Sequence, residues 1–333
     1  MTAVHLVVPD GIDDPARPSG GNAYDRHLRD GLRSLGWTVH ERAVPGFWSR
    51  PDAASFAALY DVLDEIPDGA VVLVDGLIAS TAPEVLVPRT RRLRLVVLVH
   101  MPLGDDAERA VLTAAASVIT TSEWSRRRLM ELYALPRVHV AVPGVDPAPL
   151  ASGSDSGETL LCVAAVTPGK GHDVLLDALA TLTDLSWVCV CVGSLDRDPE
   201  FVEQLRRRDG RVTFAGAETG ADLDRRYEEA DLLVLASRGE TYGMVVTEAL
   251  ARGVPVVAAE VGGVTEALGH GANGTPPGLL VPPDDPAALA AALRAWLSDP
   301  ELRERLRRAA RERRESLPDW ASTTAAVADV LGR

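Results

Sequence analysis

Two acidic residues, Glu240 and Glu248, stand eight positions apart in the stretch SRGETYGMVVTEALARGVPV (237–256). The apolar run LLVLAS (232–237) predicts a buried strand, and RGETYG predicts the loop at its carboxyl end. The run MVVTEALARG predicts a helix that Gly253 ends. Glu240 is therefore expected in the loop, and Glu248 is expected more than one turn into the helix.

The start of this helix offers hydrogen-bond donors to a negatively charged ligand. The N–H groups of Gly243, Met244 and Val245 have no acceptors within the helix, and its dipole favours an anion there. Ionised carboxylates accept paired hydrogen bonds from the hydroxyls of a sugar. Glu240 and Glu248 therefore predict a diphosphate flanked by two sugar groups, one at each glutamate.

Lys170 is the only lysine among 34 lysine and arginine residues. A position that keeps lysine in so arginine-rich a chain favours a compact ammonium over a planar guanidinium. It lies in AAVTPGKGHDVLL (164–176), which predicts a strand, a Pro-Gly turn and a helix. A point charge at a helix start suits a phosphate group. The stretch lacks the G-x-x-x-x-G-K-[ST] pattern, so it is not a Walker A loop.

Short apolar runs alternate with amphipathic stretches along nearly the whole chain, beginning with a helix predicted at 23–35. Runs that predict strands are 5–9, 38–44, 70–76, 93–100, 159–166, 187–193, 212–216, 232–237 and 254–259. A Pro-, Gly- and Ser-rich stretch at 147–157 predicts a linker, and the alternation restarts after it. The sequence thus predicts two doubly wound α/β halves, whose ligands bind where strands end.

The composition excludes several classes of function. The net charge of −14 argues against nucleic acid, whose phosphates would repel the chain. The three cysteines, Cys162, Cys189 and Cys191, lie in apolar runs and predict buried thiols rather than a metal site. His172 suits a helical first turn as well as a ligand. The sequence shows neither a signal peptide nor a membrane span, so we expect a cytoplasmic protein.

Three stretches resemble the retaining glycosyltransferases of family four, also called glycosyl transferases group 1. They are the paired glutamates with ARGVPVVAAEVGGVTE (251–266), the run KGHDVLLDAL (170–179) and the run at 212–237. The resemblance implies the GT-B fold, with two Rossmann-like doubly wound domains facing across a cleft. It implies an N-terminal acceptor-binding domain at 1–147, with 318–333 packing back on it. It implies a nucleotide-sugar donor domain at 158–317.

The resemblance also implies roles for residues of the donor domain. In the family the first glutamate touches the transferred sugar, which here is Glu240, and the second holds the nucleotide ribose, here Glu248. The lysine after the first strand of this domain holds the diphosphate, here Lys170. Relatives often have an arginine five residues before that lysine, where this chain has Ala165. Tyr242 stands where the family usually has phenylalanine.

Two stretches of the N-terminal half match less closely. A Gly-rich loop after the first strand approaches the phosphates in the family, and PSGGNAYDRHL makes Gly20 and Gly21 the match. A histidine after a later strand lies near the transferred sugar, and LVVLVHMPLG makes His100 the match. The resemblance therefore implies that His100, Glu240 and Lys170 take part in catalysis.

The expected reaction moves a sugar from a nucleotide-diphosphate sugar to an acceptor hydroxyl with retention of configuration. Asp196 and Asp198 could hold a divalent cation on a diphosphate, but they equally suit a polar loop and a helix start. Because Lys170 and a helix N-terminus already supply a phosphate site, we expect no metal and no cofactor beyond the donor itself. The acceptor is a small molecule, a glycan or a lipid, and nothing supports membrane contact.

Two other functions fit the same fold. One is a nucleotide-sugar epimerase or a phosphorylase-like enzyme, although the latter needs a pyridoxal lysine and the only lysine here lies in the phosphate loop. The other is a nucleotide-sugar-binding relative without transferase activity, because fold does not fix function. The missing arginine at Ala165 is the feature that favours this second alternative.

Overall fold

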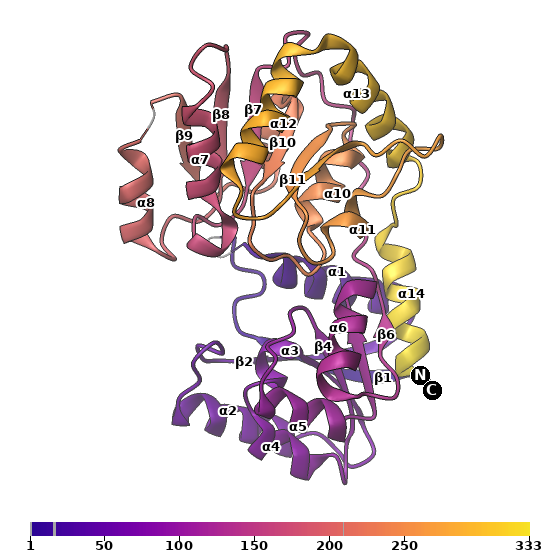
Figure 1. Cartoon of the computed structure of the whole chain (residues 1–333). Helices are drawn as coiled ribbons and strands as arrows, with labels where there is room; N and C mark the ends of the chain where they lie inside the picture. The colour runs from indigo at the N-terminus through magenta and orange to yellow at the C-terminus, as the bar shows by residue number, and fades with distance from the viewer. Residues whose placement is uncertain (1, 16–17, 209) are drawn as a thin grey trace. The chain divides into compact units, whose positions relative to one another are not determined.

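The computed structural model describes residues 2–15, 18–208 and 210–333, and the chain divides into two compact units (Figure 1). The first contains 19–144 and 318–333 together with the N-terminal stretch up to Asp14. The second consists chiefly of Val145–Leu317. Each unit is built around its own six-stranded sheet.

All neighbouring strands of the N-terminal sheet are parallel, in the order β2-β1-β3-β4-β5-β6. Their bounds are Ala3–Pro9 (β1), Thr38–Val44 (β2), Val71–Asp75 (β3), Arg94–Val99 (β4), Ser117–Thr120 (β5) and His139–Val140 (β6). The chain order reverses between β1 and β3, and such a reversal opens a crevice at the strands' carboxyl ends.

Helices cover both faces of this sheet. One face packs on α1 and α14 through residues such as Leu28 and Val327, and the other packs on the remaining long helices through residues such as Leu59 and Leu129. The helices are α1 (Gly20–Ser34), α2 (Ala53–Asp64), α3 (Gly76–Ala79), α4 (Pro83–Arg89), α5 (Asp106–Ala114), α6 (Glu123–Tyr133) and α14 (Trp320–Leu331).

The second sheet is also parallel and has the order β12-β11-β10-β7-β8-β9. Its strands are β7 (Thr159–Val163), β8 (Val188–Val192), β9 (Val212–Gly216), β10 (Leu232–Leu235), β11 (Val256–Ala259) and β12 (Gly278–Val281). The first strand of the unit, β7, therefore lies between the second and the fourth. Its switch point falls between β7 and β10, next to Lys170 and Glu240.

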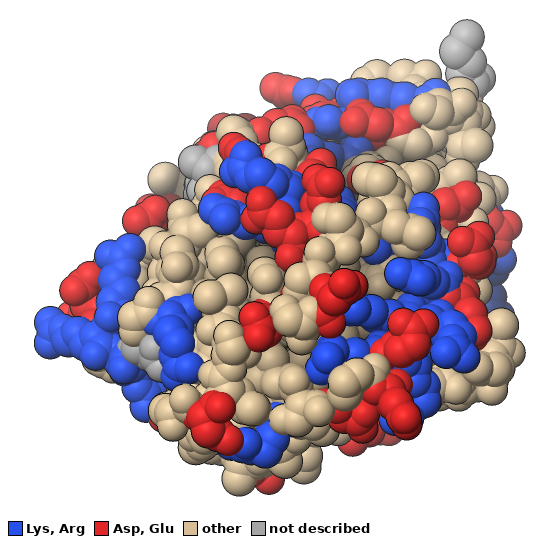
Figure 2. Space-filling view, turned by 90° about the horizontal axis from the view of Figure 1, so that it is seen from above, with Lys and Arg blue, Asp and Glu red and all other residues tan. Residues whose placement is uncertain are grey.

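The connections of the second unit are mostly helical. They are η1 (Pro168–Lys170), α7 (His172–Ala180), α8 (Pro199–Arg206), α9 (Ala221–Glu229), α10 (Met244–Ala251), α11 (Val264–Leu268), α12 (Pro286–Ser298) and α13 (Pro300–Arg314). Helices α7, α8, α12 and α13 share one hydrophobic cluster with the sheet, in which Trp187 and Trp296 are buried. The chain's net negative charge is not gathered into one patch on the face in Figure 2, where acidic and basic side chains are interspersed.

The structure differs from the sequence-based expectations at several elements. Strands β5, β6 and β12 were not predicted, and β6 has only two residues. Helix α1 begins at Gly20 rather than at residue 23, since Ser19 caps it and accepts a hydrogen bond from the Asn22 N–H. The charged run ELRERLRRAARERRE (301–315) predicts an exposed helix, but the helix it forms, α13, buries one face that includes Leu306 and Ala310.

The predicted linker at 147–157 packs on the second unit, and the division between units falls at Gly144 and Val145. Ser154 donates from its backbone N–H and from its hydroxyl to the two carboxylate oxygens of Asp231, at 2.5 and 2.7 Å. Arg307 pairs with the same carboxylate at 3.0 Å. The small residues of this stretch therefore form the turns that satisfy a buried acid. Among the described residues, no helix is long and apolar enough to cross a membrane.

Helix α14 is fastened to the N-terminal sheet by polar contacts as well as by its apolar face. The Arg94 guanidinium donates to the carbonyl oxygen of Val330 at 2.9 Å, and the Thr323 hydroxyl donates to that of Val142 at 2.7 Å. Gly31 of α1 lies directly against Thr324 of α14, so a Cβ at this position would overlap the threonine side chain. The absence of a side chain at residue 31 lets the two helices approach.

We expect Gly31→Ala to lower the free energy of unfolding by about 1–3 kcal/mol, because it overpacks the α1–α14 contact despite alanine's better helix propensity. Denaturant unfolding measures this loss. The double variant Gly31→Ala/Thr324→Ala should recover part of it, since the substitution removes the two closest threonine atoms. A single variant as stable as the parent would show that the helices can move apart freely.

Candidate functional site

Lys170 lies at the carboxyl end of the second sheet, in the turn that joins β7 to α7. The one-turn helix η1 ends at Gly171, whose φ of +66° starts α7 without a side-chain cap. A Cβ on Gly171 would overlap the carbonyl oxygen of Ala236, just after β10. Only glycine allows both this backbone angle and this close approach, so the lysine turn rests directly on the neighbouring strand's loop.

The structure brings Lys170 and Glu240 together. The Lys170 Nζ lies 2.7 Å from the Glu240 Oε1, and the hydroxyl of fully buried Ser237 donates to the same oxygen at 2.8 Å. The lysine side chain is 33% exposed and that of Glu240 is 14% exposed, so an entering ligand can reach both. Ser237 was not singled out from the sequence, although its place at the end of a predicted strand was the available signal.

Arg238, which directly follows Ser237, pairs with two aspartates rather than with Glu240. Its guanidinium makes a bidentate pair with Asp173 at 2.8 and 3.0 Å and contacts Asp284 at 2.6 Å. It also donates to the carbonyl oxygen of Pro168 in the lysine turn. Burial alone would raise the pKa of Asp173, but the hydrogen bonds and charge of Arg238 hold it below its ordinary value. Arg238 therefore braces the turn.

The backbone of Glu240 is supported from behind by a loop of two glycines. The Gly263 N–H donates to the Glu240 carbonyl oxygen at 3.0 Å. Gly262 has a φ of +54°, and a Cβ there would overlap that same oxygen. The pair belongs to the stretch that carried the family resemblance, but its function of setting the Glu240 loop could not be read from the sequence.

Helix α10 begins immediately after this loop, as predicted. Gly243 is its N-cap with no side-chain cap hydrogen bond, and Met244 and Val245 form its first turn. Its backbone N–H groups and dipole provide a partial positive charge next to the loop that carries Glu240. Tyr242 is 4% exposed, so its ring is buried as a phenylalanine would be. Burial raises the pKa of Tyr242 to about 12 and keeps it neutral.

Glu248 lies on the second turn of α10 and is half-buried. Its Oε2 accepts a hydrogen bond from the hydroxyl of buried Tyr227 at 2.7 Å. Burial raises the pKa of Glu248, although the Tyr227 hydrogen bond and the charge of Arg252 oppose the rise. One carboxylate oxygen is thus fixed by the tyrosine while the group keeps further acceptor capacity. Tyr227, on α9, was missed by sequence reasoning, although it lies in the run at 212–237 that carries part of the family resemblance.

The predicted residues of the N-terminal unit also lie close together. Gly20 and Gly21 form the first turn of α1 and not a Gly-rich loop, which corrects the expectation, because Ser19 caps the helix immediately before them. A Cβ on Gly21 would lie 3.4 Å from the His100 Cδ2. His100 follows β4, and its Nε2 is 3.0 Å from the Oδ1 of Asp25.

Ala164 and Ala165 lie just after β7 and are half-buried. Neither side chain can donate to a phosphate, so no cation of the family type stands at this point. Asp198 accepts the N–H of Phe201 at 3.1 Å as the N-cap of α8. Asp196 is exposed in the preceding loop.

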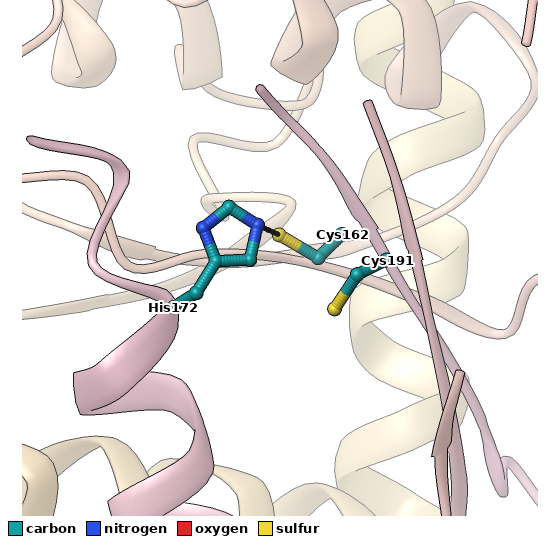
Figure 3. Close-up of side chains that lie close together, drawn as sticks. All are labelled: Cys162, His172 and Cys191. Carbon is teal, nitrogen blue, oxygen red and sulfur yellow. Dashed lines mark hydrogen bonds between the residues drawn. The ribbon is translucent and has the colours of Figure 1, made fainter. Parts of the chain in front are cut away.

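Two groups of described side chains are close enough to hold a metal ion, and one is the buried set Cys162, His172 and Cys191 (Figure 3). The Cys162 Sγ lies 3.7 Å from the His172 Nε2, and the cysteines are register partners on β7 and β8. The His172 Nδ1 is buried without a hydrogen-bond partner in the described structure. Ligating histidines usually donate their second ring N–H to an acceptor, so this arrangement favours an Nε2–H tautomer that donates to Cys162.

The second group is Asp25, Asp75 and His100 of the N-terminal unit. Asp75 ends β3, and its Oδ2 lies 3.6 Å from the His100 Nε2. Neither aspartate was predicted, because one lies inside a helix and the other ends a strand without a recognisable motif. His100 is thus hydrogen-bonded to one buried carboxylate and lies within ion-pair distance of a second.

The fold and the site geometry define a class of protein. Two parallel, doubly wound sheets of six strands, each with helices on both faces, constitute the GT-B fold. Residues 151–313 match the family described as Glycosyl transferases group 1. This segment of the chain therefore belongs to that family.

Curated relatives agree with this assignment. The D-inositol 3-phosphate glycosyltransferase of Kineococcus radiotolerans is 34% identical over 257 aligned residues, covering 68% of this chain and 59% of that protein. The protein of the same name from Jonesia denitrificans is 31% identical over 254 residues, with the same coverage of 68% and 59%. The chain therefore spans about three fifths of the length of these relatives.

Solved structures share the fold at lower identity. Sucrose-phosphate synthase from Thermosynechococcus elongatus has a TM-score of 0.80 and is 22% identical, with 99% of this chain and 98% of that chain covered. Anabaena HepE in complex with UDP-glucose has a TM-score of 0.76 and is 19% identical, with both chains fully covered.

We expect Gly262→Ala to lower the free energy of unfolding by at least about 2 kcal/mol, because the new methyl group meets the Glu240 carbonyl oxygen in a left-handed backbone conformation. Gly239→Ala is the matched control, since a Cβ there meets open space and residue 239 has no positive φ. It should change stability by less than about 0.5 kcal/mol. Equal losses in the two variants would show that the loop, and not the backing glycine, is the sensitive element.

Proposed function

We propose that the protein is a retaining glycosyltransferase that moves a sugar from a nucleotide-diphosphate sugar to an acceptor hydroxyl. The observation that carries the proposal is the ion pair between the Lys170 Nζ and the Glu240 Oε1, 2.7 Å apart beside the uncapped start of α10. A cation, free helix N–H groups and a carboxylate are the partners that a sugar diphosphate requires. Family membership and the names of the curated relatives support the reaction class.

The chemistry breaks the bond between the sugar C1 and the diphosphate oxygen. The leaving group gains negative charge as the bond lengthens, so preorganised positive charge lowers the barrier. Lys170 and the N–H groups of Gly243, Met244 and Val245 would supply it. The family resemblance implies attack of the acceptor hydroxyl on the same face, with its proton passing to the leaving phosphate. Glu240 would then orient the sugar and need not act as a base.

The Lys170–Glu240 pair also suggests how the donor enters. Without a ligand, the lysine is held by Glu240, which Ser237 also contacts. A diphosphate would compete for the ammonium, and the released carboxylate oxygen would accept sugar hydroxyls instead. Glu248, with one oxygen fixed by Tyr227, would accept from the ribose. The family resemblance also implies that Gly20 and Gly21 contribute to donor binding and that His100 contacts the sugar.

The test begins with a thermal-shift screen of nucleoside diphosphates and their sugars, because a bound ligand stabilises the protein by mass action. Uridine diphosphate is the first choice, since the HepE structures contain UDP and UDP-glucose. Inositol 3-phosphate, from the relatives' name, is the first acceptor to supply. Transfer of sugar with retained anomeric configuration supports the proposal. Binding without transfer to any acceptor favours the non-catalytic alternative, and conversion of the donor to its epimer favours the epimerase.

We expect Lys170→Ala to weaken nucleoside diphosphate binding about tenfold to a hundredfold, the equivalent of roughly 1.5–3 kcal/mol for a charge-assisted hydrogen bond. Glu240→Gln should leave that affinity unchanged or improve it, because it releases the ammonium, while turnover falls. Glu248→Gln should weaken binding through the lost ribose contact. Isothermal titration of the three variants checks this pattern. If Lys170→Ala binds the nucleoside diphosphate as tightly as the parent does, another residue must contact the phosphates. Arg238 is already paired with two aspartates.

We also propose that the transfer requires no divalent metal. Asp198 is occupied as a helix cap, and the ammonium with the start of α10 supplies positive charge at the diphosphate. Activity should therefore persist in excess EDTA, and Asp196→Ala should retain parental turnover. Asp198→Ala should lose about 0.5–2 kcal/mol of stability through the lost cap and keep its affinity for the donor. Loss of activity in EDTA with recovery on Mn²⁺ would refute metal independence.

A further inference from the structure

Three titratable side chains meet at the carboxyl ends of the central strands of the N-terminal unit. Asp75 ends β3, His100 follows β4, and Asp25 lies on the second turn of α1. The His100 Nε2 lies 3.0 Å from the Asp25 Oδ1 and 3.6 Å from the Asp75 Oδ2. The side chains of the two aspartates are 1% and 7% exposed, whereas that of His100 is 19% exposed. Only the histidine can therefore meet a ligand.

The hydrogen bonds of this cluster are incomplete if both aspartates are ionised. The Asp75 Oδ1 accepts the Leu77 N–H at 2.5 Å, and the Asp25 Oδ1 has the histidine. The Asp25 Oδ2 is buried and has no partner among the described residues. Two adjacent buried carboxylates repel each other, and an unsatisfied charged oxygen is costly. A proton between the two carboxyl groups removes both problems.

We propose that this buried cluster holds two protons near neutral pH: one shared between the carboxyl groups of Asp25 and Asp75, and one on His100, which is thereby fixed as an imidazolium ion. Asp25 and Asp75 act as positioning residues, since they are buried and set the charge of the one exposed member. The remaining negative charge of the carboxyl pair balances the imidazolium, so the cluster as a whole is close to neutral.

The electrostatics agree with this arrangement of protons. Burial raises the pKa of Asp75 to about 7, and the charge and hydrogen bond of Asp25 add to the rise. Burial alone would lower the pKa of His100, but the charge and hydrogen bond of Asp25, with the charge of Asp75, outweigh it and raise it to about 9. Tyr24 packs edge-on against His100 and donates its hydroxyl to the Ala141 carbonyl oxygen. Burial raises the pKa of Tyr24 above its ordinary value, so the phenol stays neutral.

The consequence for catalysis rests on the proposed function. While His100 is an imidazolium ion, it cannot accept the proton of the acceptor hydroxyl. It can donate a hydrogen bond to the donor sugar or its phosphate. This fits a reaction in which the leaving phosphate takes that proton. The imidazolium is present below the raised pKa of His100 and is lost as the pH rises through about 9. Turnover should therefore fall on that alkaline limb and not near pH 6.5, the usual value for histidine.

The test is an NMR titration of the ¹³C–¹H signals of labelled histidines in the full chain, treated with chelator, from pH 5 to pH 10. The chain has seven histidines, and His100→Gln assigns the signal. We expect the His100 midpoint near pH 9. Asp25→Asn should bring it below pH 7, because burial then acts without the partner charge. Asp75→Asn should lower it less than Asp25→Asn does, because Asp25 contributes both charge and a hydrogen bond and Asp75 contributes charge alone. A smaller step of the His100 signal near pH 7 should mark the loss of the shared proton from the carboxyl pair, and Asp75→Asn should remove that step.

Each outcome decides a part of the proposal. A parental midpoint below pH 7 overturns it without any variant. A parental His100 signal without the step near pH 7 shows that the carboxyl pair holds no shared proton at neutral pH. If stoichiometric Zn²⁺ or Mn²⁺ abolishes the pH-dependent change of the His100 signal, the cluster holds a cation in place of the protons. The titration needs no substrate, so it tests the charge of His100 independently of transferase activity. The charge state can be confirmed in a protein without transferase activity, and it can be refuted in one that transfers sugar.

Discussion

The ion pair between Lys170 and Glu240 joins the loops at the ends of two adjacent parallel strands, and close backbone contacts hold those loops where the two charges meet. Strands β7 and β10 are neighbours only because the sheet reverses its order there. The lysine turn rests on the β10 loop through Gly171, and Glu240 is set from behind by Gly262. Both backbones are thus fixed before any ligand arrives. A preformed pair of opposite charges can exchange partners with a sugar diphosphate without reorganising the loops.

The two units differ in how far their charged groups are exposed to solvent. In the second unit, Lys170 and Glu240 remain partly exposed, so their attraction is moderated by water and can be exchanged for a ligand. In the N-terminal unit, the two aspartates beneath His100 are buried, where unpaired charges are costly and protons are retained. The first arrangement suits a group that must change partners, and the second suits a group whose charge must stay constant.

The sequence predicted the features that repeat or that lie in one loop, and it failed for those that depend on tertiary neighbours. Continuous β-branched runs located most long strands, and the Glu240–Glu248 spacing placed one acid in a loop and the other on α10. Asp25 and Asp75 were invisible because each looks like an ordinary helix or strand residue until the sheet order brings both to His100.

Local composition also misled where a tertiary contact decided the structure. At the start of α1 it was the family resemblance that implied a Gly-rich loop, yet Ser19 caps a helix that includes both glycines by a local hydrogen bond. The stretch at 147–157 has the composition of a linker, but the N–H and the hydroxyl of Ser154 within it donate to buried Asp231. Such corrections share one cause: glycine and serine permit tight turns, and only the surrounding acceptors determine whether those turns stay open or pack.

The rarity of lysine finds its explanation in what the arginines do. Arg94 and Arg313 donate to backbone carbonyl oxygens of Val330 and Leu268, and so fasten helices to the body of each unit. Arg238 donates two hydrogen bonds from its guanidinium to the Asp173 carboxylate. A planar guanidinium suits such fixed, multiple contacts, because its donors are preorganised. The same rigidity is a disadvantage where a cation must pass from a carboxylate to a phosphate within one narrow turn. An ammonium on a flexible stem suits such an exchange, which agrees with the proposed role of Lys170.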